Sequence, residues 1–322
     1  MNTLRLSVAL CTHNGSPFLR DQLESIAAQS QLPEELVVCD DGSTDSTPQI
    51  LNDFAGHAPF PVRLHTRETP VGSTGNFEQA IALCQGDIIV LADQDDFWLP
   101  HRLRDTASAF QSDPSVGAFF SDAEIVDASR KPLGYHLWDV VRFGSREQAR
   151  VQRGQAVPLL LRRNVVTGAT LAFKSEFRKL ILPIPDGWVH DGWIALLIAT
   201  TGKLAFSPQS LIQYRQHSGN QIGAVRREFA DQFERARTVH GDTYAAAGGN
   251  FAAAQDRLLL VGATVPKEVI HMFQGKIAHM QARAQLSRSR IRRLPATLYE
   301  LAVGHYHCYS NGWRSFARDI YF

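Results

Sequence analysis

The chain has 322 residues, enough for one large domain with an appendage or for two modest domains. Its composition is ordinary, with 20% charged residues and a formal net charge of +1, so there is no electrostatic case for nucleic acid as the main partner. It contains no run of about 18 apolar residues, so we expect no membrane-spanning helix.

Short apolar, β-rich runs recur in the first 120 residues, and a helical pattern separates each run from the next. The runs cover residues 6–11, 35–39, 62–65, 87–92 and 116–120, and the later helical patterns cover 47–54, 74–84 and 100–110. The first helical pattern repeats Leu19, Leu23 and Ile26 on one face. This alternation predicts an α/β fold with a mostly parallel sheet, helices on both faces, and ligands at the carboxyl ends of the strands.

Polar clusters follow three of these expected strands. Thr12-His13-Asn14 follows the first, Asp40-Asp41-Gly42-Ser43 the second, and Asp93-Gln94-Asp95-Asp96 the fourth. Because parallel strands end at one edge of a sheet, we expect a single crevice to collect all three clusters.

The most informative cluster is the group of carboxylates Asp93, Asp95 and Asp96, packed within four positions. Like charges held this close raise one another's pKa or require a counter-ion, and an all-oxygen ligand set suits Mg²⁺ or Mn²⁺. The cluster therefore predicts a metal site for phosphate chemistry. The alternative is that these acids cap the helix expected to start near Pro100.

Regularity fades between Asp122 and Trp188, where we expect mainly loops. Residues 142–153 are polar and basic, and residues 165–173 are rich in Thr and Val and predict a strand. From residue 226 onward the pattern is helical, and between residues 266 and 293 seven Lys or Arg residues face a single acid, Glu268.

Four motifs stand out in chain order. They are Ser7-Val8-Ala9-Leu10-Cys11-Thr12-His13-Asn14-Gly15, Val38-Cys39-Asp40-Asp41-Gly42-Ser43-Thr44-Asp45, Asp93-Gln94-Asp95-Asp96-Phe97-Trp98 and His190-Asp191-Gly192-Trp193. Together they resemble glycosyltransferase family 2, nucleotide-sugar-dependent enzymes with a GT-A fold, over residues 6–220. The wording of residues 93–100 and 214–220 is similar to the bacterial rhamnosyltransferase branch.

The resemblance implies a metal-dependent inverting glycosyltransferase that uses a dTDP- or UDP-sugar. It implies transfer of a sugar, with rhamnose a candidate, to a hydroxyl of a cell-surface polysaccharide, a lipopolysaccharide or a lipid-linked glycan. We expect a GT-A catalytic domain over 1–222, with nucleotide-sugar binding in 1–122 and the acceptor side in 123–222, followed by a helical region over 223–322. A non-catalytic nucleotide-sugar binder and, less favoured, a glycoside hydrolase stay open as alternatives.

The resemblance assigns metal and diphosphate contacts. Asp95 is expected to coordinate the metal directly, Asp93 to bind the metal or the sugar-ribose side, and Asp96 to support them. His217 is expected to complete the metal shell or touch the diphosphate, and Arg215 to pair with phosphate. The alternative for His217 and Arg215 is ordinary solvation in a polar loop.

Nucleoside recognition falls on the first two clusters. Thr12, His13 and Asn14 belong to the loop beside the nucleobase, where the family usually has Tyr in place of His13. Asp40 or Asp41 can accept the N3–H of uracil or thymine or a ribose hydroxyl, and the resemblance favours Asp41 for the base. The alternative for both acids is an Asx turn.

Asp191 is the expected general base, which removes the proton of the acceptor hydroxyl as its oxygen attacks the anomeric carbon. Trp188 and Trp193 flank it and are expected to form an apolar sugar platform. The alternative is that Asp191 caps the apolar helix over 192–200.

Two further segments receive donor-side roles from the resemblance. Arg67, Gly72 and Asn76 lie between the third strand and its helix. Gly168-Ala169-Thr170 is similar to the family's small-residue segment beside the donor sugar, although a plain strand turn explains it as well.

The remaining expectations concern location and partners. Cys11, Cys39, Cys84 and Cys308 have no metal-ligand spacing and indicate buried thiols in a reducing compartment. The N-terminal residues do not have the signal-peptide pattern, so we expect a cytoplasmic protein. The basic C-terminal segment is compatible with peripheral contact to anionic lipid on the inner membrane face, or with packing on the catalytic domain or on another subunit, such as a homodimer partner.

Overall fold

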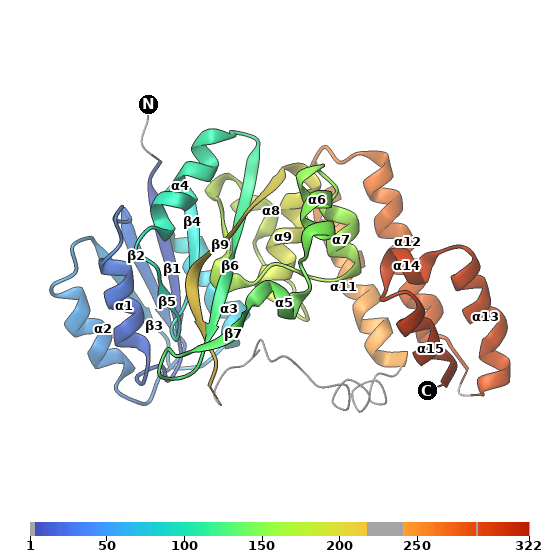
Figure 1. Cartoon of the computed structure of the whole chain (residues 1–322), viewed down its shortest axis with the longest axis horizontal. Coiled ribbons are helices and arrows are strands. Elements are labelled where there is room, and N and C mark those ends of the chain that lie inside the picture. The colour runs from blue at the N-terminus through green and yellow to red at the C-terminus, as the bar shows by residue number, and fades with distance from the viewer. Residues whose placement is uncertain (1–3, 218–240, 288, 322) are drawn as a thin grey trace. The chain divides into compact units, whose positions relative to one another are not determined.

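The computed structural model of the chain describes residues 4–217, 241–287 and 289–321 (Figure 1). It divides into two compact units, which are described separately. The sheet unit comprises Met1–Gly154, Val165–Ile184 and Val189–Ala224, and the helical unit comprises Gln155–Asn164, Pro185–Trp188 and Val225–Phe322. The helical unit thus takes two short earlier segments, whereas the sequence predicted a single division after residue 222.

The sheet unit is built on one sheet. Its described strands are β1 (Leu6–Thr12), β2 (Glu35–Asp40), β3 (Val62–Thr66), β4 (Ile88–Asp93), β5 (Phe97–Trp98), β6 (Val116–Val126), β7 (Pro132–His136), β8 (Ala172–Lys174) and β9 (Lys203–Arg215). Their order is β3-β2-β1-β4-β8-β6-β9-β5, with β7 paired to β6. The stretch from β3 to β4 is parallel throughout, as is the β6–β9 pair, while β8 runs antiparallel to both neighbours.

Helices cover both faces of this sheet, as the sequence predicted. They include α1 (Leu19–Ala27), α2 (Thr47–Ala55), α3 (Gly72–Leu83), α4 (Arg102–Ser112) and α9 (His190–Thr201). Val8 and Leu10 of β1 point into an apolar cluster with side chains of α1, α2 and α4. The alternate residues of β1 face the other side of the sheet, where Ser7 Oγ accepts a hydrogen bond from Gly86 N, just after α3. Burial on both faces explains why the parallel strands appear as nearly continuous apolar runs.

The segment from residue 122 to 188 is more regular than the sequence predicted. It contains α5 (Leu137–Val141), α6 (Ser145–Gln152), η1 (Gly168–Thr170), η2 (Ser175–Phe177) and α8 (Arg178–Ile181). The basic stretch expected as a loop is largely α6, whose only buried residue is Val151, so it lacks the apolar stripe that marks a helix. The strand expected over 165–173 is wrong for most of its length, because 168–170 form a 3₁₀ turn and only 172–174 pair in the sheet.

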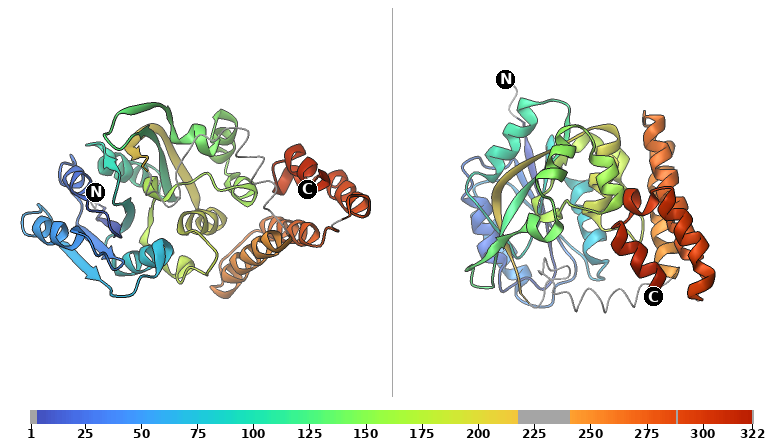
Figure 2. Two further views of the ribbon diagram at one scale, coloured as in Figure 1. Left: turned by 90° about the horizontal axis from the view of Figure 1, so that it is seen from below. Right: turned by 45° about the vertical axis from the view of Figure 1, so that its right-hand side comes forward.

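The helical unit contains α7 (Ala156–Arg162), α11 (Gly241–Leu260), α12 (Lys267–Ala284), α13 (Arg290–Ala302), α14 (His305–Tyr309) and α15 (Trp313–Tyr321). Helices α11 and α12 form an antiparallel hairpin, which can be followed in Figure 2. Gly241 faces the backbone of Ala284, and Gly248 faces Met280. The absence of a side chain at these glycines allows the two helices to approach closely.

The basic C-terminal segment is not a uniformly solvated face. Lys276, Arg283 and Arg293 are buried, whereas Arg290 and Arg292 are exposed; Arg288 lies outside the described residues. No described helix has the length and apolarity needed to cross a membrane. Three of the four free cysteines are buried, as the sequence predicted, but the prediction is wrong for Cys308, which is exposed.

Candidate active site

The three polar clusters meet at the carboxyl edge of β1, β2 and β4. The strand register pairs Thr12 with Asp40 and Cys11 with Asp93. Thr12 Oγ1 donates to Asp40 Oδ1 at 2.6 Å, which links the first two clusters directly. Gln94 links the first and third, because its amide accepts from His13 N at 2.8 Å and donates to His13 O at 3.0 Å.

Carboxylates crowd this edge. Burial, followed by the charges of Asp95 and Asp191, raises the pKa of Asp93 to about 7. Burial, followed by Asp95 and Asp93, raises the pKa of Asp96 well above its ordinary value. None of the three acids caps the next helix, since α4 starts at Arg102 with His101 as its N-cap and no side-chain cap hydrogen bond. The capping alternative is therefore wrong, and the crowding calls for bound protons or a cation.

Two of the expected metal ligands are in direct contact. His217 Nε2 lies 2.8 Å from Asp95 Oδ2, and its ring packs 4.5 Å from that of Phe18. Asp96 Oδ2 is buried without a hydrogen-bond donor among the described residues. Oxygen-rich donors and one imidazole fit a hard divalent cation. These donors do not surround a single ion position in this structure, because no described trio at this edge has all its ligand atoms within 4.8 Å of one another.

Arg215 holds residues 93–96, the acidic turn, in position through several hydrogen bonds. Its backbone N–H donates to Asp96 Oδ1 at 3.1 Å, and its Nε donates to the Asp95 carbonyl at 2.8 Å. The two terminal nitrogens donate to Ala128 O and to Asp21. The side chain is 3% exposed. In this structure Arg215 holds the acidic turn in position, and the phosphate contact expected from the sequence stays a prediction.

Arg102 was not anticipated from the sequence. It is buried beneath the acids, with its guanidinium 3.8 Å from the Trp98 ring and NH2 donating to Leu91 O at 3.0 Å. Burial lowers its pKa to about 9, and the charges of Asp96 and Asp93 oppose that shift. Arg102 is one of the buried residues of α4 and lies six residues after Asp96. An arginine at a buried helix position so close to an acidic cluster is the sequence signal that would have identified its role.

Asp40 and Asp41 have different surroundings. Asp40 accepts from Ser43 N at 3.0 Å and from Ser43 Oγ at 2.5 Å, so the turn interpretation describes its local contacts. Asp41 accepts instead from Val71 N at 2.9 Å and Gly72 N at 2.8 Å, the N-cap and first residue of α3. Gly72 has a φ of +80°, a conformation that suits glycine at this contact.

The loop after β1 is open to solvent and rests on the second cluster. The His13 ring lies with Nδ1 2.7 Å from the Asp41 carbonyl, and Asn14 has a φ of 49°. Asn14 N donates to Ser43 Oγ at 2.8 Å, and its Oδ1 accepts from Thr44 N at 2.8 Å. Both side chains are exposed, which leaves them available to a ligand.

Asn76 and Arg67 border the same edge from the β3–α3 region. Asn76 is buried, and its Nδ2 donates to Cys39 O at 2.8 Å, while its Oδ1 has no donor among the described residues. Arg67 lies 3.6 Å from Asp41 and donates to Gln79. Asn76 thus holds a buried acceptor with unused capacity.

Asp191 lies in the first turn of α9. Its Oδ2 accepts from Gly168 N at 3.1 Å, and its Oδ1 accepts from the adjacent Gly192 N at 2.5 Å. Val189 is the N-cap, so Asp191 supports the helix start from inside the helix rather than as its cap. Its charge also contributes to the raised pKa of Asp93, which identifies Asp191 as a neighbour of the acid cluster.

The aromatic platform expected around Asp191 is wrong for Trp193. Trp193 is fully buried, and its Nε1 donates to Ile181 O at 2.7 Å. Trp188 belongs to the helical unit, where its Nε1 donates to Asn250 O and its ring packs on Phe251. Both tryptophans are used here for packing.

His190 precedes Asp191 and is also buried. Its ring stacks on Phe77 at 4.1 Å, and neither ring nitrogen has a hydrogen-bond partner among the described residues. Burial lowers its pKa to about 3. A Cβ on Gly168 would lie 2.5 Å from His190 Nε2, so glycine is required here for the turn that donates its N–H to Asp191.

The fold and the strand-end acids define a GT-A type α/β protein, and solved structures agree. Staphylococcus aureus TarS 1–349 in complex with UDP-GlcNAc is similar with a TM-score of 0.57 and 17% identity, covering 98% of this chain and 82% of that chain. The mannosyltransferase PcManGT from Pyrobaculum calidifontis, in complex with GDP-Man and Mn²⁺, is similar with a TM-score of 0.55 and 21% identity, covering 99% and 86%. At these identities the likeness establishes the fold.

The family follows from the sequence comparison. Residues 7–157 match the model described as Glycosyl transferase family 2, and this part of the chain belongs to that family. The chain is 25% identical over 229 residues to the dTDP-rhamnosyl transferase RfbG of Shigella flexneri, covering 67% of this chain and 74% of that protein. It is 24% identical over 226 residues to a Mycobacterium tuberculosis protein, covering 66% of this chain, and the match spans 59% of that relative's length.

Proposed function

We propose that the protein is a metal-dependent inverting glycosyltransferase that moves a sugar from a dTDP- or UDP-sugar to an acceptor hydroxyl. The observation that carries the proposal is that Asp93 and Asp95, at the end of β4, have Asp191, in the first turn of α9, as a neighbour: after burial, the charges of Asp95 and Asp191 raise the pKa of Asp93. A glycosyltransferase of this kind needs a cation at the diphosphate and a base for the acceptor hydroxyl. Asp93 and Asp95 can hold the cation, and Asp191, from a distant segment, can act as the base.

For donor binding, the proposal uses the exposed loop after β1 and the second cluster. His13 and Asn14 lie open beside Asp41, in reach of a nucleobase. Since Val71 and Gly72 already donate to the Asp41 carboxylate, a base N3–H would use its remaining lone pairs. Thr12 and Asp40 are buried beside this loop and hydrogen-bonded to each other. Asn76 Oδ1 offers a buried acceptor for a donor-side hydroxyl.

The cation in this proposal is Mg²⁺ or Mn²⁺, held by Asp95 with Asp93 and His217. When bound, it supplies neutralisation of the charge that develops on the nucleoside diphosphate leaving group. The protein's own contribution is to keep the acids in place. Arg215 fixes the backbone of Asp95 and the carboxylate of Asp96, so the acidic turn does not have to reorganise around the ligand.

Asp191 is the proposed base. The backbone N–H groups of Gly168 and Gly192 donate to its two carboxylate oxygens and hold the side chain in place at the start of α9. The acceptor oxygen forms its bond to the anomeric carbon as the bond from that carbon to the diphosphate oxygen breaks, and the hydroxyl proton passes to Asp191. Attack opposite the leaving group inverts the anomeric configuration.

The test is a donor panel of dTDP-rhamnose, UDP-glucose, UDP-galactose, UDP-N-acetylglucosamine and GDP-mannose, each with and without Mn²⁺. Slow hydrolysis and thermal protection report binding and turnover without a known acceptor. Asp191→Asn should bind donor and lose transfer by at least about 100-fold, the range of a positioned general base. Asp53→Asn, on the exposed side of α2, is the matched control. Near-normal turnover of folded Asp191→Asn would refute the base assignment.

The finer substrate proposal is rhamnose from dTDP-rhamnose, for addition to a surface polysaccharide, lipopolysaccharide or lipid-linked glycan. Its support is the similarity to the dTDP-rhamnosyl transferase of Shigella flexneri and the sequence of the acidic motif. Protection by dTDP-rhamnose over UDP-sugars supports it, and preference for GDP-mannose would overturn it.

A second candidate, a non-catalytic nucleotide-sugar binder, is favoured by one observation. Both Asp191 oxygens already accept backbone N–H groups, as a purely structural carboxylate would. Such a protein would gain thermal stability from donor and Mn²⁺ but release no nucleoside diphosphate.

We also propose peripheral contact between the helical unit and an anionic membrane. On α13, Ile291 and Leu298 are 80% and 52% exposed and lie seven residues apart on one face, beside the exposed Arg290 and Arg292. Each basic residue near an anionic surface contributes about 1 kcal/mol. Ile291→Ser should weaken salt-sensitive binding to phosphatidylserine vesicles, and Leu32→Ser, exposed in the sheet unit, should not. Absence of vesicle binding with concentration-dependent dimerisation would assign this face to a homodimer.

A further inference from the structure

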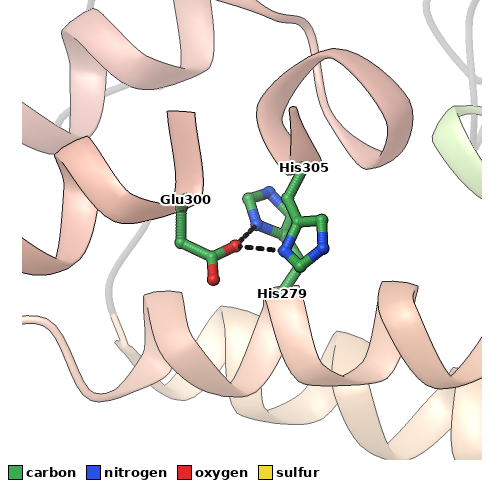
Figure 3. Close-up of side chains that lie close together, drawn as sticks. All are labelled: His279, Glu300 and His305. Carbon is green, nitrogen blue, oxygen red and sulfur yellow. Dashed lines mark hydrogen bonds and ion pairs between the residues drawn. The ribbon is translucent and has the colours of Figure 1, made fainter. Parts of the chain in front are cut away.

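A second group of metal-ligating side chains lies within the helical unit. His279 comes from α12, Glu300 from α13 and His305 from the first position of α14, as Figure 3 shows. Among the described residues, this is the one trio of His, Cys, Asp or Glu whose ligand atoms all lie within 4.8 Å of one another. His279 and Glu300 are buried, and 29% of the His305 side chain is exposed.

The two imidazoles point at the same carboxylate oxygen. Glu300 Oε2 lies 2.5 Å from His279 Nδ1 and 2.9 Å from His305 Nδ1 (Figure 3). Gly304, with a φ of +80°, turns the chain between α13 and α14 and returns His305 to Glu300, five residues earlier. The local fold thus forms the Glu300–His305 pair, and α12 adds the third ligand.

We propose that His279, Glu300 and His305 bind one divalent transition-metal ion of the zinc class and join α12, α13 and α14 through it. Two imidazole nitrogens and one carboxylate oxygen form a donor set that zinc uses, with a remaining position for water. Metal–ligand bonds of about 2.0–2.2 Å place ligand atoms of one ion roughly 3–3.5 Å apart. The observed separations of 2.5 and 2.9 Å are shorter than this, and all three ligand atoms lie within 4.8 Å of one another, so binding an ion requires the side chains to shift.

The surroundings of His279 suit a ligand that binds through Nδ1. Its Nε2 lies 3.0 Å from Ser310 Oγ, which also accepts from Arg283 NH1 at 2.8 Å. A serine hydroxyl can accept two hydrogen bonds, so it can take the Nε2–H of His279 and leave Nδ1 unprotonated for the metal. This outer hydrogen bond is the kind that orients metal-bound histidines.

Neighbouring positive charge is compensated. Arg283 Nε donates to Asp319 Oδ2 at 2.6 Å and its NH2 to Oδ1 at 2.8 Å, an ion pair buried on both sides. Lys276 donates to Tyr309 O at 2.8 Å, and burial lowers its pKa to about 7, so it is able to lose its charge beside a bound cation. A metal ion bound by His279, Glu300 and His305 would therefore not face a fixed, unpaired positive charge from Arg283 or Lys276.

The test uses the full chain carrying Asp95→Asn, which weakens the proposed strand-end metal site. Protein stripped with chelator is supplied with Zn²⁺, desalted and analysed for metal per chain. We expect one zinc per chain, lost when His305→Ala is added and retained when His307→Ala, an exposed histidine of the same helix, is added. Zinc retained by His305→Ala, or no zinc held without that change, would overturn the proposal.

Two further variants keep the test informative if an alanine variant folds poorly. Glu300→Gln preserves size and should abolish the zinc-dependent rise in melting temperature. Ser310→Ala should weaken zinc binding by roughly 10- to 100-fold, as expected for loss of an outer hydrogen bond to a metal-bound histidine. With Co²⁺ as the probe, the absorption spectrum should lack thiolate bands and be unchanged by Cys308→Ser; sulfur ligation would contradict the donor set.

Discussion

Replacing His190 with leucine should make the folded protein less sensitive to mild acid. The buried imidazole has a pKa of about 3, compared with 6.5 in an unfolded chain, so the unfolded state binds more protons between these values. Stability contributed by the neutral ring is complete above about pH 6.5 and is lost progressively as the pH falls toward 3. At pH 5 the loss from this one group is about 2 kcal/mol, since each pKa unit corresponds to about 1.4 kcal/mol.

The assay is urea unfolding of the wild type and of His190→Leu at several pH values from 5 to 8. Leucine has a similar volume and no titrating group, so the wild-type free energy of unfolding should fall by about 2 kcal/mol more than that of the variant between pH 7 and 5. Between pH 7 and 8 the two curves should run parallel, which serves as the internal control. Parallel curves over the whole range would refute the burial of a neutral imidazole against Phe77.

Three further predictions follow from single contacts. Gly168→Ala places a Cβ against His190 and should destabilise the fold by about 1–3 kcal/mol while lowering kcat, measured by urea unfolding and donor turnover. Arg215→Lys cannot reproduce the guanidinium contacts with three separate oxygens, so turnover should fall at least about tenfold; unchanged Mn²⁺ and donor affinity would contradict the positioning role. Trp193→Phe should cost about 1 kcal/mol of stability and leave donor affinity unchanged, whereas weaker donor binding would restore the platform hypothesis.

The sequence predicted the parallel part of the sheet because its strands are buried on both faces. Such strands appear as continuous apolar runs, and the polar residues that follow them mark one edge. The contacts between Thr12 and Asp40 and between Gln94 and His13 are consequences of that register. Asp95 and His217 are 122 positions apart, and the resemblance to a known family, rather than periodicity, suggested their contact.

The parts that were not predicted depend on tertiary context. Helix α6 has no apolar stripe, and an arginine such as Arg215 looks solvated until its acceptors are known. Trp193 beside an acid suggests a sugar platform, but its indole N–H has a partner within the core. The His279, Glu300 and His305 trio has no recognisable spacing, because the three side chains come from three different helices.

The most direct test of the strand-end site is calorimetric titration of the wild type and Asp95→Asn with dTDP and UDP, with and without Mn²⁺. A single cation shared by the acids and the diphosphate predicts that Mn²⁺ strengthens nucleotide binding to the wild type at least about tenfold, or about 1.4 kcal/mol, and that Asp95→Asn abolishes this gain. Nucleotide binding that is equally tight without Mn²⁺, and unaffected by Asp95→Asn, would contradict the account.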